Sequence, residues 1–275
     1  LRPVGFAFRN RLPQARWRGA WDWALTIAGV VPPLVFGVAF GNLFLGVPFH
    51  FSERMVPMYD GTFLGLFHPF ALLVGVLSLS LFVMHGASFA SMKIEGEVGA
   101  RARNIARIAS LFAMASFAAC GVWLLAISAP VITNGITAGA PSNPLGKQVL
   151  LSSGAWLAHH RQYPWSVAMP LIALLALAGA ACLHGIRARF IASGTAMASV
   201  ILSAGISLFP FLLPSSTEPS HGLTVWDASS SQKTLGIMLV ATLLLLPIVL
   251  AYTTWAFRVM RGPVTRAHIE KQEIT

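Results

Sequence analysis

The sequence is poor in charged residues and in cysteine. Of its 275 residues only 10% are charged and 56% are hydrophobic, whereas about a quarter of the residues in a soluble domain are charged. The two cysteines, Cys120 and Cys182, both lie in apolar segments, without the pattern of a disulfide framework or metal-ligand spacing. These shortages exclude an ordinary soluble domain and a disulfide-stapled one, and they indicate an integral membrane protein.

Acidic residues are missing from the middle of every apolar segment. All nine Asp and Glu residues lie in expected loops, in the tail or in the first turn of a segment. Ion-coupled transporters usually need ionisable groups inside the membrane, so this shortage argues against that mechanism. No Ser-His-Asp, Cys-His or Walker arrangement stands out. Gly37, Gly41 and Gly65 follow no strand and are expected to allow close helix packing.

Long apolar runs are what the sequence has in abundance. A helix needs about 20 apolar residues to cross a bilayer, and six spans are expected, at residues 19–44, 66–92, 105–131, 166–186, 190–213 and 235–257. The pattern predicts an all-α integral membrane protein with a single transmembrane domain over residues 1–275. Within the long loop before the fourth span, residues 147–160 are expected to form a helix along the membrane interface.

Positive charge is distributed unevenly along the chain, whose formal net charge is +10. Fifteen of the 19 Lys and Arg residues lie in or beside the N-terminal segment, the links after the second and fourth spans, and the tail; four lie in the alternate loops. Because positive loops stay cytoplasmic, both ends are expected on the cytoplasmic face. The basic excess therefore needs no nucleic-acid partner.

The segment 209–231 joins the last two spans and is rich in ordered-turn signals. Two prolines should end the fifth span, and Ser229 and Gln232 have the spacing of a capping box that would begin the sixth. Trp226 suits the headgroup level, and Asp227, in or just before the first turn, would complement the helix dipole. The segment is either a well-formed helix connection or a loop that docks onto something.

Histidines are the residues that could hold a membrane haem. His85 and His184 differ in depth by roughly 7 Å at the usual helical rise, so packing roles are favoured over a shared haem. The histidine pair at 159–160 lies near Trp156 and Trp165, which is typical of an interfacial belt. It has no carboxylate or cysteine at metal-site spacing.

Asp22 lies between two tryptophans at the start of the first span. It is either a carboxylate that complements a helix start or the partner of a nearby arginine, with Arg2, Arg16 and Arg18 as the candidates. In the second case the pair would hold the chain as it enters from an upstream helix.

Several motifs together resemble subunit II of the cytochrome bd-type quinol oxidases. They are residues 2–6 (RPVGF), 21–23 (WDW), 32–34 (PPL), 37–42 (GVAFGN), 46–49 (GVPF), 154–157 (GAWL) and 209–231. The likeness runs in order through essentially the whole chain. His68 and His85 depart from it, since better-known members have Asn and Gln there, and this argues against a haem-ligand role for either.

The resemblance implies a subunit of about nine helices in two bundles, of which this chain would hold the last six. The complex oxidises quinol and reduces O2 to water in the bacterial inner membrane. Its two b-type haems and one d-type haem belong to subunit I, the partner in a heterodimer. In some members subunit II holds a structural quinone, and a small accessory subunit is allowed.

The resemblance also implies roles for two residues. Arg2 and Asp22 match family positions linked to assembly or haem stability, and we add Trp226 and Asp227 as structural candidates. No catalytic, cofactor-binding or metal residue is expected in this chain. The hypothesis is a haem-free scaffold subunit; the alternatives are a multi-spanning permease and a self-contained b-haem anchor.

Overall fold

The computed structural model describes residues 2–135, 142–259 and 262. Its helices are α1 (Arg2–Phe8), α2 (Ala15–Leu45), α3 (Pro69–Lys93), α4 (Gly96–Leu124), α5 (Ala158–Gln162), α6 (Ala168–Cys182), α7 (Ile186–Leu208) and α8 (Gln232–Val259). Six of them are long and apolar enough to cross a membrane, the fourth when the turn before α6 is included. The expected all-α fold with six spans is confirmed.

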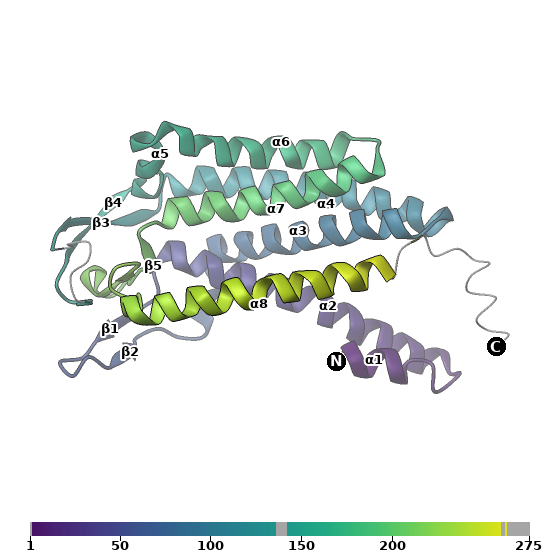
Figure 1. Ribbon diagram of the computed structural model, residues 1–275, viewed down its shortest axis with the longest axis horizontal. Helices are drawn as coiled ribbons and strands as arrows, with labels where there is room; N and C mark the ends of the chain where they lie inside the picture. Colours follow the sequence, from purple (N-terminus) through teal and green to yellow (C-terminus); the bar gives the residue numbers. More distant parts are fainter. Residues whose placement is uncertain (1, 136–141, 260–261, 263–275) are drawn as a thin grey trace.

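Short antiparallel hairpins connect the long helices at one end of the molecule. β1 (Phe49–Phe51) pairs with β2 (Pro57–Tyr59), β3 (Ser128–Asn134) with β4 (Gln148–Ser153), and β5 (Phe211–Leu213) with β6 (Leu223–Thr224). Four 3-10 helices complete these connections: η1 (Leu64–Phe67), η2 (Ala155–Leu157), η3 (Pro164–Val167) and η4 (Pro219–His221). The strands gather at the left of Figure 1, and the short α3–α4 and α6–α7 links lie at the other end. The lysine- and arginine-rich links thus share one end.

Three expectations about element boundaries are wrong. The third span is expected at 105–131, but α4 begins at Gly96 and residues 128–134 form β3. The fifth span ends at Leu208, because residues 211–213 form β5. The interfacial helix expected at 147–160 is instead β4 followed by two short helical turns. Apolar periodicity alone does not distinguish a short strand from the end of a helix.

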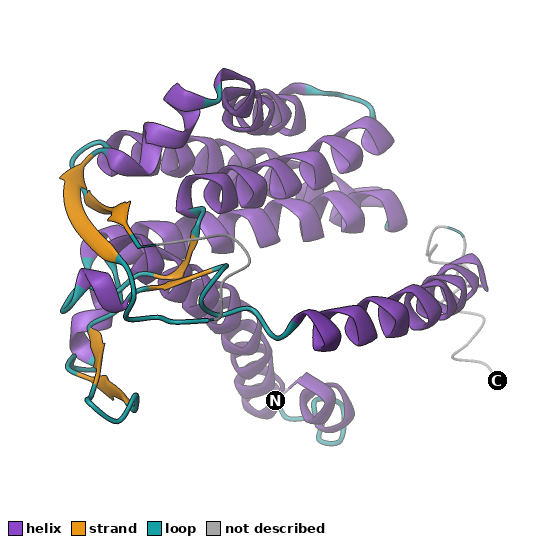
Figure 2. Cartoon of the chain, turned by 60° about the vertical axis from the view of Figure 1, so that its left-hand side comes forward, coloured by secondary structure: helices purple, strands orange, loops and turns teal. Residues whose placement is uncertain are grey.

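The core lies among α3, α4, α6 and α7, with α2 packed on α3. Small residues allow the helices to approach one another, and Ala106, Ala113, Ala173 and Ala196 are completely buried. Figure 2 shows α8 apart from this bundle. None of the 28 residues of α8, all of them described, is buried.

Glycines set the distance between α2 and α3. A Cβ on Gly37 would lie 2.6 Å from the Cα of Gly75, and one on Gly41 would lie 2.7 Å from the Cα of Ala71. The packing role expected for Gly37 and Gly41 is therefore confirmed. Gly65 lies in η1, outside any long helix, so the same expectation is wrong for it.

Candidate functional site

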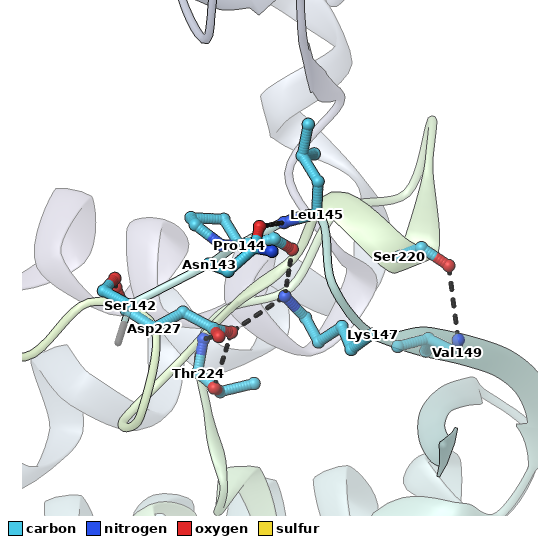
Figure 3. Close-up of polar contacts among 9 residues, drawn as sticks. All are labelled: Ser142, Asn143, Pro144, Leu145, Lys147, Val149, Ser220, Thr224 and Asp227. Atoms are coloured by element: carbon cyan, nitrogen blue, oxygen red, sulfur yellow. Dashed lines mark hydrogen bonds and ion pairs between the residues drawn. The ribbon is translucent and has the colours of Figure 1, made fainter. Parts of the chain in front are cut away.

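A buried ion pair joins two loops at the strand end of the molecule. The Nζ of Lys147 lies 2.8 Å from Oδ2 of Asp227 and also donates to the carbonyl of Pro144 at 2.6 Å, as Figure 3 shows. The two charged side chains are 0% and 7% exposed. Thr224 donates its hydroxyl to the same carboxylate oxygen, and Ser142 donates to the carbonyl of Asp227. The contacts of Lys147 and Ser142 with Asp227 fix one loop on the other.

This ion pair changes the role expected for Asp227. The residue precedes α8, which begins at Gln232, and its carboxylate faces the buried lysine. The prediction that the carboxylate of Asp227 complements the dipole of this helix is therefore wrong. The capping box is wrong as well, because Ser231, not Ser229, accepts a backbone N–H of the first turn, from Thr234 at 3.4 Å.

The segment 209–231 docks onto other loops of the same chain. Ser215 donates its hydroxyl to the carbonyl of Phe49, and the backbone N–H of Phe51 donates to Nδ1 of His221 at 3.0 Å. Of the two readings open from the sequence, the docked loop is confirmed. Its partners are the first hairpin and the loop before β4.

Tryptophans at this end have different environments. Trp226 is half-buried, with its ring 5.8 Å from that of Phe209; its place at headgroup level stays a prediction. Trp156 is only 3% exposed and donates its Nε1–H to the carbonyl of Phe44 at 3.0 Å. Trp156 is therefore packed inside the protein, whereas Trp165 is 65% exposed; the interfacial belt stays a prediction.

Asp22 binds an arginine that the sequence analysis did not single out. Arg9 donates from Nε to Oδ1 at 2.6 Å and from Nη2 to Oδ2 at 3.1 Å. The pairing considered with Arg16 or Arg18 is not found, because the turn after α1 brings Arg9 back along α2; the pairing with Arg2 stays a prediction. Arg2 begins α1, and its side chain lies outside the described part of the chain.

An apolar cavity of about 380 Å³ lies within the helix bundle. Its wall is built mainly from phenylalanine, leucine, valine and methionine side chains of α2, α3, α4 and α7. Polar groups gather where α5 meets α7: Nδ1 of His160 lies 2.7 Å from the hydroxyl of Ser166 and Nε2 lies 3.2 Å from that of Ser207. Ser203 also lines the cavity, and its buried hydroxyl has no hydrogen-bond partner among the described residues. The cavity can hold a long apolar molecule with one polar end.

The remaining histidine candidates are not brought together as a metal or haem site. Nδ1 of His85 lies 2.8 Å from the hydroxyl of Ser193, and its ring stacks on Phe190 at 4.8 Å. His184 is exposed beyond the end of α6. In the described ranges, no three or more His, Cys, Asp or Glu residues form a group that could hold a metal ion.

Neither Lys147 nor Arg9 could be selected from the sequence as a site residue. Lys147 lies 80 positions from its carboxylate partner and 13 positions separate Arg9 from Asp22. A lysine beside a glycine in a polar loop gives no local signal of burial. His160 offered a weak signal, because it follows a second histidine near tryptophans.

Known proteins resemble the chain over almost its whole length. The family model for cytochrome bd terminal oxidase subunit II matches residues 1–260. The chain is 42% identical over 276 residues to probable cytochrome oxidase subunit 2 of Haemophilus influenzae, covering 99% of this chain and 73% of the relative. It is 41% identical over 279 residues to cytochrome bd-I ubiquinol oxidase subunit 2 of Escherichia coli K12, covering 98% and 73%.

A solved structure has a similar fold. The bd oxidase from Geobacillus thermodenitrificans superposes with a TM-score of 0.59 at 17% identity, over 94% of this chain and 69% of that chain. The family match supports the oxidase hypothesis over the permease. The chain belongs to the cytochrome bd terminal oxidase subunit II family.

Proposed function

We propose that this chain is the haem-free subunit II of a bd-type quinol oxidase. In this role it packs on subunit I and helps to keep that partner's haem sites in their geometry. The family match over residues 1–260 carries the proposal. The relatives' name, ubiquinol oxidase subunit 2, supplies the activity, in which the complex oxidises quinol and reduces O2 to water in the inner membrane.

The histidine environments support the assignment of the b- and d-type haems to the partner. Nδ1 of His85 bonds to the hydroxyl of Ser193 and the ring stacks on Phe190, so packing and hydrogen bonding account for this histidine without a haem. His68 accepts the backbone N–H of Phe70 at 3.2 Å. If the chain were instead a self-contained b-haem anchor, the subunit expressed alone would show a haem spectrum.

Exposed apolar side chains provide the surface for membrane lipid and subunit I. Along α8, Leu243, Leu244 and Ile248 are 65%, 66% and 64% exposed. Such a helix needs an apolar environment on all sides. Lipid on one side and the partner subunit on the other would supply it.

The Arg9–Asp22 pair offers a direct test of the scaffold role. Asp22→Asn and Arg9→Gln each remove one charge of the contact that holds α1 on α2. We expect both variants to lower the d-haem optical band per mole of purified complex. Glu97→Gln is the matched control, because Glu97 forms a 3.7 Å ion pair with Arg101 on an exposed face. An unchanged spectrum and oxidase rate in both variants would contradict the role.

The apolar cavity is the candidate site for the structural quinone of this family. Its size lies within the range of ordinary ligand pockets, and the unpaired hydroxyl of Ser203 could donate to a quinone carbonyl. When bound, the quinone would act as a packing and hydrogen-bonding element. Ser203→Leu should reduce the quinone extracted from the purified complex, whereas Leu202→Val, at an exposed position of the same helix, should not. Equal quinone content in both would contradict the assignment.

A further inference from the structure

Three arginines gather around the C-terminal end of α6, at the end of the bundle opposite the strands. Arg107 of α4 donates its Nε–H to the carbonyl of Ala181 at 3.0 Å. Arg189, in the first turn of α7, donates from Nη2 to the carbonyl of Leu183 at 2.7 Å. Arg103 lies one helical turn before Arg107 on the same face of α4, close enough to Arg189 for the positive charges to interact. We call these three residues the arginine cluster.

The carbonyls of α6 explain only part of this arrangement. Arginines near the C-terminal end of a helix complement its partial negative charge and bind its last carbonyls. Arg189 is nevertheless only 2% exposed, and its Nε and Nη1 have no hydrogen-bond partner among the described residues. Buried donors are normally paired, so an unpaired group points to a ligand or water that completes the site.

The arginine cluster also lacks a counter-charge in the described part of the chain. None of its three members forms an ion pair there. Glu97, near the start of α4, forms its ion pair with Arg101 on an exposed face of the helix. A guanidinium group as buried as that of Arg189 is costly without an anion.

We propose that the arginine cluster binds the phosphate group of an anionic phospholipid. Guanidinium groups bind phosphate through paired, charge-assisted hydrogen bonds. The cluster lies near the ends of membrane-spanning helices, at the level where headgroups are found, and basic pockets between such helices bind anionic headgroups. Arg107 is exposed and Arg103 half-buried, which gives the phosphate access to the cluster. This inference needs the helices to lie in a membrane but does not rest on the oxidase function.

The test uses the purified complex with its partner subunit, because this chain has not been shown to fold alone. Binding of phosphatidylglycerol, phosphatidylcholine and inorganic phosphate is measured by native mass spectrometry and by the thermal unfolding midpoint. We expect phosphatidylglycerol to bind and raise the midpoint more than phosphatidylcholine. Arg107→Gln should weaken phosphatidylglycerol binding about fivefold. Arg101→Gln, on the exposed face of the same helix, should not change it.

Each outcome separates the proposed lipid from its rivals. Arg189→Gln should abolish the preference for phosphatidylglycerol; if that variant does not fold, Arg103→Gln and Arg107→Gln carry the test. A midpoint raised by inorganic phosphate as much as by phosphatidylglycerol overturns the lipid as source. If the two lipids bind equally and raise the midpoint equally, the phosphate site is overturned. Ordered water would then pair the remaining N–H groups of Arg189. If the Arg107→Gln complex loses its partner subunit in every lipid, the lipid proposal is also overturned, because the cluster would then be a contact between subunits.

Discussion

At the scale of single residues, burial decides which charges matter. Lys147 and Asp227 are almost fully buried, whereas Arg9 and Asp22 have side chains that are 39% and 52% exposed. An exposed ion pair contributes little to stability, because water and salt screen it. Removing one partner of a buried pair leaves the other charge without compensation. These two ion pairs therefore predict different phenotypes.

We predict that Lys147→Met destabilises the complex by about 3–5 kcal/mol, the usual cost of leaving a buried charge unpaired. Asp227→Asn should act in the same direction. The double variant Lys147→Met, Asp227→Leu should recover much of the loss, because neither charge remains. Thermal unfolding of the purified complex measures all three. A double variant as unstable as the sum of the single ones would show that the charges are not coupled.

His160 predicts a dependence of stability on pH. Burial, with a smaller contribution from His159, lowers the pKa of His160 below its ordinary value. The unfolded chain then binds the proton more readily, so stability is full above about pH 6.5 and falls as the pH drops below it. Unfolding midpoints between pH 7.5 and 5 should fall less steeply in His160→Gln than in the wild type. Identical slopes would rule out this contribution.

At the scale of elements, glycine contacts determine how closely α2 and α3 pack. Gly37→Ala would place its Cβ 2.6 Å from the backbone of Gly75 and from the carbonyl oxygen of Val74. Overpacking of this kind costs about 1–3 kcal/mol. Gly86→Ala is the matched control on α3, because nothing lies within 4 Å of its added Cβ. It should be neutral or slightly stabilising, since alanine is the better helix former.

Unfolding midpoints and the yield of assembled complex distinguish the two glycine variants. We expect a lower midpoint for Gly37→Ala and an unchanged or higher one for Gly86→Ala. If both variants behaved like the wild type, α2 and α3 could separate at little cost. The contact would then not be a constraint on the fold.

At the scale of the whole molecule, the ends of the helices differ in charge and in structure. The hairpins and the docked 209–231 segment lie at one end, and the basic links lie at the other (Figure 1). The side of the membrane that each end faces is a prediction from the positive-inside rule. Glu53, in the first hairpin, and Glu97, at the start of α4, are exposed residues at opposite ends.

We predict that a cysteine at position 53 reacts with a membrane-impermeant maleimide in intact cells and that one at position 97 does not. Cys182 is exposed and should first be replaced by alanine, whereas Cys120 is buried. Permeabilised cells should label both positions. The opposite pattern would reverse the predicted orientation of both termini.

Much of the fold was predictable, because the signals were local and strong. Long apolar runs specify membrane helices with little influence from neighbouring segments. The predicted bounds of all six spans agree with the observed helices within a few residues, except at the start and end of α4 and the end of α7. The closely packed glycines Gly37 and Gly41 were also predictable. The motifs at residues 21–23, 154–157 and 209–231 indicated the family.

Tertiary structure alone decided which polar residues meet. The sequence by itself determined a six-span membrane subunit of the bd-oxidase family, since hydropathy and motifs are properties of contiguous residues. It did not determine that Arg9 binds Asp22, that Lys147 is buried against Asp227, or that Arg189 keeps unpaired donors. Those contacts depend on loops and helix ends that come together only after the helices pack, and no residue type or spacing encodes them locally.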